Sequence, residues 1–193
     1  AAIPTAFIVS GVVGIIMERS VIRHLYGRPL ETLLATWGIS LVLIQTVRLI
    51  FGAQNVEVAN PSYLSGGIQA FNGVVLPFNR IAIIIFVIFV VILVWTLLQK
   101  SSLGLQVRAV TQNRGMASCV GISTRKIDMY TFGLGSGVAG LGGVALSQVG
   151  NVGPELGQLY IVDSFMVVVL GGVGKIAGTV AGAMGLGVLN KFL

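Results

Sequence analysis

Residues 81–98 read IAIIIFVIFVVILVWTLL, eighteen consecutive residues without a charge. A helix needs about 20 mostly apolar residues to cross the hydrocarbon core of a bilayer, where each backbone polar group must be bonded within the segment. The composition agrees, because 9% of the 193 residues are charged, whereas soluble domains carry about 25%. We therefore predict an all-α, polytopic membrane protein.

Three further stretches predict spans of the same kind, at residues 3–17, 33–51 and 129–146. The region 159–190 is interrupted by a cluster of glycines at 171–174. Short apolar pieces separated in this way are typical of the half-helices of transporters, so the region is either two spans or one re-entrant element. We expect a single transmembrane domain over residues 1–193, a helical bundle with broken or half-helices. We also expect it to be a fragment that lacks flanking spans at both ends.

Basic residues fall on one side of these spans. Loops 18–31 and 99–128 carry the basic residues Arg19, Arg23, Arg28, Lys100, Arg108, Arg114, Arg125 and Lys126. Loops 52–80 and 148–163 carry one, Arg80. Cytoplasmic loops are enriched in Lys and Arg, so the first pair of loops is predicted to be cytoplasmic in an inner (plasma) membrane. The positive net charge therefore needs no nucleic acid as a partner.

Small residues recur at four-residue intervals in two of the apolar regions. The rows are Gly135, Ala139 and Gly143, and Gly174, Gly178 and Gly182. Such a face lets two helices approach closely, which predicts tight helix packing or, as the alternative, the wall of a narrow solute path. Residues 135–140 also fit G-x-G-x-x-G, but they follow no predicted strand and lie within a predicted span. A dinucleotide site is therefore not expected.

The basic loop contains RAVTQNRGMASCVGISTRKID at 108–128, which predicts a short helix between two spans. Asn113 can cap its start, Gly121 can end it, and Ser123 can cap the next span. Small side chains at Ala117 and Ser118 leave room for docking in a groove of another protein. Basic residues such as Arg114 and Arg125 could pair there with acids. An ordinary basic loop that meets lipid headgroups remains the alternative.

The spacing of this loop resembles the coupling loop of permease subunits from ABC importers of the branched-chain amino-acid type. The matching positions are Arg108, Ala109, Gln112, Asn113, Arg114, Ala117, Gly121 and Ile122. The resemblance covers essentially the whole chain. Stretches 26–41, 51–67, 103–114 and 151–174 are most similar to the urea-transport branch of that family. The resemblance implies that residues 104–127 dock on an ATPase.

This resemblance implies the remaining parts of a transport system. They are a second homologous permease subunit, two cytoplasmic ATPase subunits, an external solute-binding protein and the lipid bilayer. The chain would bind no cofactor, ATP and Mg being held by the ATPases, and it contains no G-x-x-x-x-G-K-[ST] motif of its own. The implied function is urea import by alternating access. The alternative within the family is a branched-chain amino-acid permease.

Two other function classes remain to be compared. A passive channel for a small neutral solute finds weak support in a single Asn60-Pro61-Ser62 triplet, which reads more simply as a turn. An intramembrane enzyme would need a catalytic cluster, yet His24 and Cys119 are each the only residue of their kind.

Polar side chains near the external ends of the spans are candidates for contact with a solute. They are Gln45, Gln148, Asn151, Asp163 and Ser164. The same residues are also compatible with ordinary interface polarity. Arg48 is expected to extend toward the outer surface and Glu57.

Overall fold

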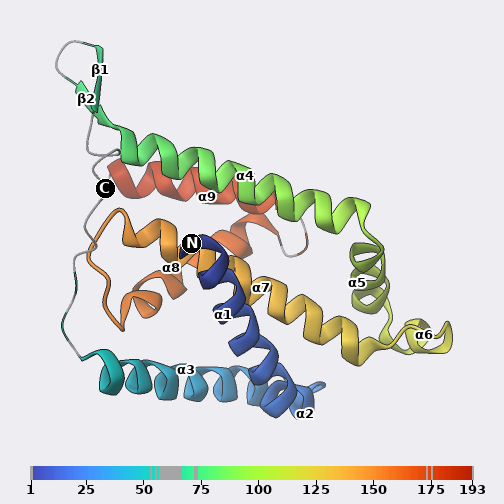
Figure 1. Cartoon of the computed structure of the whole chain (residues 1–193). Coiled ribbons are helices and arrows are strands. Elements are labelled where there is room, and N and C mark those ends of the chain that lie inside the picture. Colours follow the sequence, from blue (N-terminus) through green and yellow to red (C-terminus); the bar gives the residue numbers. More distant parts are fainter. Residues whose placement is uncertain are drawn as a thin grey trace. The chain divides into compact units, whose positions relative to one another are not determined.

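The computed structural model describes residues 2–52, 54, 56, 67–71, 74–172, 174 and 176–192. Contacts divide the chain into two compact units, Ala1–Val152 (unit 1) and Gly153–Leu193 (unit 2). The described elements are helices apart from one short hairpin and one isolated bridge (Figure 1).

Unit 1 contains the long apolar helices. They are α1 (Ala2–Met17) with its extension through the π-helical turn η1 (Glu18–Ile22) and α2 (Arg23–Leu25), α3 (Pro29–Phe51), α4 (Phe78–Lys100) and α7 (Thr124–Ser147). Among the described residues, four stretches are long and apolar enough to cross a membrane: Ala2–Leu25, Leu30–Phe51, Phe78–Lys100 and Thr124–Ser147. The predicted all-α polytopic fold and its four spans are confirmed.

A β-hairpin lies in the region between α3 and α4, where only a loop was expected. Strands β1 (Gly67–Phe71) and β2 (Val74–Pro77) pair antiparallel, with Gly67 opposite Pro77. A separate bridge joins Val56 to Val152, whose amides donate to each other's carbonyls at 2.9 and 3.0 Å. The Asn60-Pro61-Ser62 triplet and Glu57 lie outside the described residues.

Helix α1 packs along α7 through small residues (Figure 1). A Cβ placed on Gly11 would lie 3.3 Å from the carbonyl oxygen of Gly133, and one on Gly140 would lie 2.8 Å from that of Ala6. Gly133 and Gly137 are buried in this contact. Backbones can approach this closely only where side chains are absent.

The contact face of α7 is not the predicted row. A Cβ on Gly135 or Gly143 would meet no atom within 4 Å among the described residues, and Ala139 is exposed. The face that meets α1 holds Gly133, Gly137 and Gly140, which are four and three residues apart and lie on a different side of the helix. Because α7 has small residues on two faces, only the position of α1 selects one of them.

Substitution at this contact gives a first prediction. Gly140→Ala should destabilise unit 1 by about 1–3 kcal/mol, because its Cβ would overlap the Ala6 backbone and Ser10. Gly142→Ala is the matched control in the same helix, since a Cβ there meets no described atom within 4 Å. Thermal unfolding in detergent measures both. Equal melting temperatures for the two variants would contradict the packing.

Unit 2 consists of two helices, α8 (Leu156–Gly171) and α9 (Ile176–Phe192), which pack against each other. They have 16 and 17 residues, so each is about 24–26 Å long at 1.5 Å per residue, short of the 30 Å hydrocarbon core. Gly172 and Gly174 lie between them with φ of 82° and 89°.

The predicted row of small residues in unit 2 is partly displaced. Gly178 and Gly182 lie in α9 against α8. Gly174 does not belong to that helix face, because it precedes α9 and has a left-handed backbone. A four-residue spacing puts residues on one helix face only where all of them belong to the helix, and Gly174 lies before the start of α9 at Ile176.

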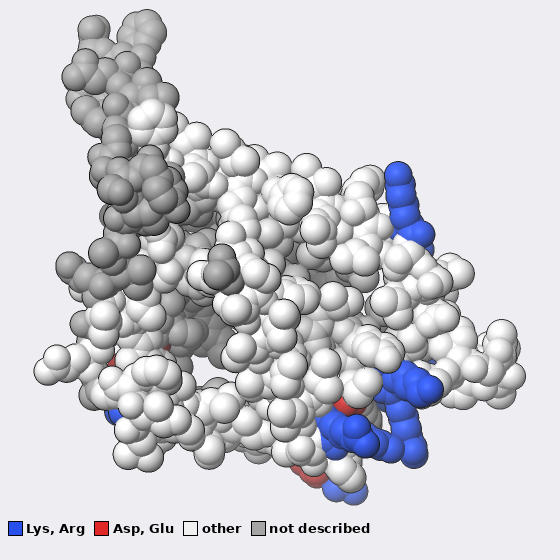
Figure 2. Space-filling model, viewed as in Figure 1, with Lys and Arg blue, Asp and Glu red and all other residues white. Residues whose placement is uncertain are grey.

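Basic side chains gather at one end of unit 1, around α2, α5 (Ser102–Gln112) and α6 (Arg114–Cys119) (Figure 2). This end joins the two loops predicted to be cytoplasmic, and we call it the basic end. The protein is a multi-pass membrane protein, with the basic end on the cytoplasmic side by the distribution of charge.

Candidate functional site

The basic end contains an additional helix, α5, which begins at a sharp corner after α4 (Figure 1). Ser101 lies at its N-cap, and the Ser101 hydroxyl accepts a hydrogen bond from the Gly104 amide at 3.3 Å. Gly104 is buried, and a Cβ there would lie 2.0 Å from the carbonyl oxygen of Leu98. Glycine is thus required for the corner between α4 and α5.

Sequence reasoning missed α5 as a separate helix, although a signal exists. A serine cap precedes Leu103, Val107 and Val110, which have the i, i+4, i+7 spacing of an apolar helix face. In the structure Val110 belongs to a small core with Ala117 and Ile127, and Leu103 and Val107 pack against that core. The coupling-loop region therefore consists of two helices rather than one.

The short helix α6 is capped at both ends. The side-chain oxygen of Asn113 accepts from the Met116 amide at 3.0 Å, as predicted for an N-cap. At the other end Gly121 has φ 87° and its amide donates to the Ser118 carbonyl, while the Ile122 amide donates to that of Ala117, both at 3.0 Å. These two bonds make a Schellman motif, so the predicted end at Gly121 is confirmed.

The predicted cap at Ser123 differs from the structure. Ser123 does occupy the N-cap position of α7, but its side chain makes no capping bond. Its backbone carbonyl accepts from the amides of Lys126 and Ile127 instead. The sequence identified the position and not the donor–acceptor geometry.

Ala117 is turned into the protein. It is 4% exposed and packs with Val110 of α5 and Ile127 of α7. We expected its small volume to serve docking in a partner's groove, and this is wrong: the volume is used where α5, α6 and α7 meet. The outward face of α6 instead carries Met116 and Val120, 65% and 74% exposed.

Arg114 is also engaged within the chain. Its guanidinium forms an ion pair with Asp128 of α7 and lies over the Tyr26 ring, 4.4 Å from the centroid. The expectation that Arg114 pairs with an acidic residue of a partner is therefore corrected. Arg125 is exposed, so for this residue the expectation stays a prediction. Burial raises the pKa of the Tyr26 hydroxyl, the charges of Asp128 and Glu18 raise it further, and Arg114 opposes them. Through Arg114, α6 is fixed to both α7 and the α2–α3 turn.

The other residues of the coupling-loop spacing lie along α5. Arg108 donates to the side-chain oxygen of Gln99 at 2.9 Å, which holds α5 against the end of α4. Ala109 is half-buried, and Gln112 is exposed at the end of α5.

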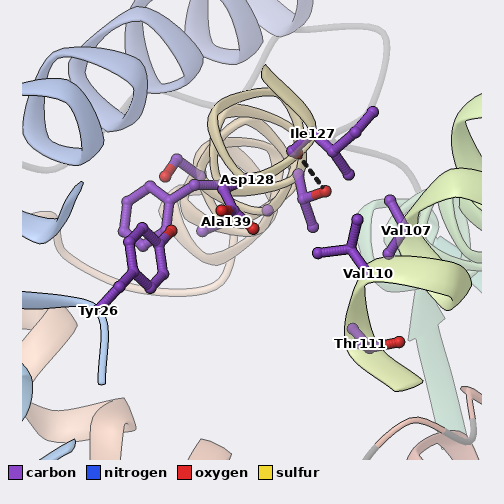
Figure 3. A pocket seen from close by; sticks show the side chains of 11 residues that line it. Tyr26, Val107, Val110, Thr111, Ile127, Asp128 and Ala139 are labelled. Carbon is purple, nitrogen blue, oxygen red and sulfur yellow. Dashed lines mark hydrogen bonds between the residues drawn. The ribbon is translucent and has the colours of Figure 1, made fainter. Parts of the chain in front are cut away.

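A cavity of about 490 Å³ separates α5 from Tyr26 and Asp128 (Figure 3). Val107, Val110 and Thr111 lie on one side of it in Figure 3. Further along α7 its lining includes Gly135 and Ala139, the row that does not meet α1. Of the two interpretations of that row, the lining of a cavity fits these residues better than helix packing.

Of the five candidate solute residues, Gln45, Gln148 and Asn151 lie in unit 1, and Asp163 and Ser164 lie in unit 2. Gln45, Asn151 and Ser164 are exposed on separate elements, and Gln148 contributes its backbone carbonyl to a bond from the Asn79 side chain at 2.8 Å. Asp163 lines a cavity of about 410 Å³ within unit 2, whose lining contains none of the other four.

Comparison with known proteins identifies the family. Residues 1–193 match the family described as the permease component of branched-chain amino acid transport systems. The chain belongs to this family. It is similar to the high-affinity branched-chain amino acid transport system permease protein BraD of Pseudomonas aeruginosa, with 32% identity over 100% of the chain and 64% of that protein. The LivH permease of Escherichia coli is 29% identical over 95% of the chain and 61% of its own length.

Part of the chain is also similar to a ribose import permease. The ribose import permease RbsC of Bacillus subtilis is 30% identical over 53% of the chain. The chain spans 64% and 61% of the lengths of BraD and E. coli LivH. No solved structure matches it. The resemblance to branched-chain-type permeases is confirmed, while the urea branch stays a prediction, since these relatives are named for branched-chain amino acids and ribose.

Proposed function

We propose that the chain is a permease subunit of an ATP-driven importer and moves a small solute inward by alternating access. The observation that carries this proposal is α6: a short helix capped at both ends, fixed by its own small core, with Met116 and Val120 facing outward at the basic end. A helix held in this way can transmit force from a docked protein. A plain tether would need neither the caps nor the core.

The coupling follows from the contacts of α6. An ATPase that binds the Met116–Val120 face moves α6, and the Arg114–Asp128 ion pair carries this movement to α7. The whole system would contain a second permease, two ATPases that hold ATP and Mg, and an external solute-binding protein. The passive-channel alternative differs in a measurable way, because it requires no ATPase.

Branched-chain amino acids are the solute that the named relatives support. Urea is the second candidate, supported by the resemblance of stretches 26–41, 51–67, 103–114 and 151–174 to the urea-transport branch. A hydrophobic pocket and a pocket for a small diamide differ in shape and polarity, so one system should not serve both solutes equally.

Uptake by cells that carry the complete system decides between them. With radiolabelled leucine at low concentration, we expect ATP-dependent uptake that excess valine inhibits and excess urea does not. The reverse pattern, urea uptake that is insensitive to leucine, would establish the second candidate. Uptake of either solute that persists after inactivation of the ATPase would show a channel and refute the proposal.

A further inference from the structure

The basic end holds a second, charged cavity of about 320 Å³ beside the one described above. Its lining is Glu18, Arg23, His24, Tyr26, Arg114, Thr124, Arg125 and Asp128. Tyr26 and Asp128 line both cavities, so these two side chains form the boundary between them. Its volume lies within the roughly 300–1,000 Å³ typical of sites for small molecules.

Glu18 sets the chemistry of this charged cavity. It is 2% exposed, and its Oε1 accepts no hydrogen bond within the part of the chain that the structure describes. A buried carboxylate oxygen without a donor is costly, so the site favours an occupant that brings one. Glu18 also begins a π-helical turn, a distortion that is frequent at functional sites.

The arginines that line the cavity differ in whether another side chain of this protein already binds them. The guanidinium of Arg114 is engaged by Asp128 and Tyr26 and is therefore not the partner of Glu18. Arg23 and Arg125 are exposed and supply donors at the rim. The lining of the cavity thus combines the carboxyl groups of Glu18 and Asp128 with the exposed donors of Arg23 and Arg125.

This arrangement selects for one class of occupant. The carboxylates of Glu18 and Asp128 would repel an inorganic anion, and the three guanidiniums would repel a metal ion. Each of these ions is therefore compatible with only part of the lining. A small molecule with N–H donors at one end and a carboxylate or carbonyl oxygen at the other suits all of it. An amino acid and urea share this chemistry.

We propose that the charged cavity is an exit-side binding site for the imported solute, with the solute's amino group on Glu18 and its oxygen atoms on Arg125. The inference rests on the proposed function, because it takes the solute from that proposal. In this proposal the larger cavity is part of the solute path, and solute that leaves it past Tyr26 and Asp128 enters the charged cavity before release. Solute on the cytoplasmic side then binds the same site and slows further transport.

The test uses the complete transporter in proteoliposomes with the cytoplasmic face accessible, and measures ATP-driven transport while leucine, or in a separate arm urea, is added on that side. The wild type should be inhibited by the solute it transports. Glu18→Gln should raise the inhibitory concentration at least about tenfold, since it replaces a charged acceptor by a neutral amide. Arg125→Gln should do the same for leucine and less for urea, which lacks a carboxylate.

Arg19→Gln is the matched control, because Arg19 is exposed in the same π-helical turn and does not line the cavity. It should leave the inhibitory concentration unchanged. A wild type that transports neither solute refutes the proposed function. A wild type that transports but is not inhibited from the cytoplasmic side overturns the inference alone. The same holds if both variants behave like the wild type. Should Glu18→Gln fail to assemble, the exposed Arg125 decides the result.

Discussion

Gly178→Ala should separate α8 from α9 and destabilise unit 2 more than any other single-methyl change considered. Its Cβ would lie 1.9 Å from the carbonyl oxygen of Gly171, a backbone atom that cannot rotate away. Overpacking lowers the free energy of unfolding by about 1–3 kcal/mol and occasionally more. Because the obstructing atom belongs to the backbone, we expect a loss of about 3 kcal/mol or more for Gly178→Ala. The gain of about 1 kcal/mol from replacing a helical glycine by alanine does not offset it. Thermal unfolding and the yield of assembled transporter measure the effect.

Gly185→Ala is the control in the same helix, because a Cβ there meets no atom within 4 Å among the described residues. It should be neutral or stabilising by up to about 1 kcal/mol, from helix propensity alone. If both variants assemble and melt alike, α8 and α9 do not cross at Gly171 and Gly178.

Ala117→Trp should disorganise α5 and α6 themselves, and not only the face of α6 that we propose docks on an ATPase. Ala117 is 4% exposed between Val110 and Ile127, and an indole cannot enter this small core without expelling α6. We expect the free energy of unfolding to fall by about 3 kcal/mol, which is the upper end of the range for overpacking. The expected signs are faster proteolysis between residues 112 and 124 and loss of the ATPase on co-purification.

Two further variants at the end of α6 distinguish a loss of folding from a loss of ATPase binding. Cys119→Trp places the same side chain at an exposed position and should leave the loop resistant to protease. Val120→Asp changes the outward face without touching the core and should reduce co-purification of the ATPase while the loop stays intact. If Ala117→Trp retains both protease resistance and the ATPase, α6 is a tether and the proposed coupling is wrong.

Much of the fold was accessible from local properties of the chain. Membrane spans depend on summed hydropathy over about 20 residues, and each predicted span falls within a candidate span of the structure. The caps of α6 at Asn113 and Gly121 depend on residues within one helical turn, so they too were predicted correctly. Helix α5 had the same kind of local signal and was overlooked.

The contacts between elements could not be obtained in this way. Helix α7 carries small residues at helical spacing on two faces, and only the placement of α1 decides that Gly133, Gly137 and Gly140 meet it while Gly135 lines a cavity. Ala117 is small enough for either a partner's groove or an internal core, and the positions of α5 and α7 decide for the core.

The charged residues also separate what local sequence determines from what tertiary contacts determine. The sequence by itself determined that this chain crosses a membrane, that its basic loops share one side, and that a capped helix lies among them. The tertiary structure decided that Arg114 pairs with Asp128 and stacks on Tyr26, and that Oε1 of Glu18 is buried without a donor among the described residues. The reason is physical: hydropathy and capping act along neighbouring residues, whereas an ion pair or a buried carboxylate depends on which distant segments the packing brings within a few ångströms.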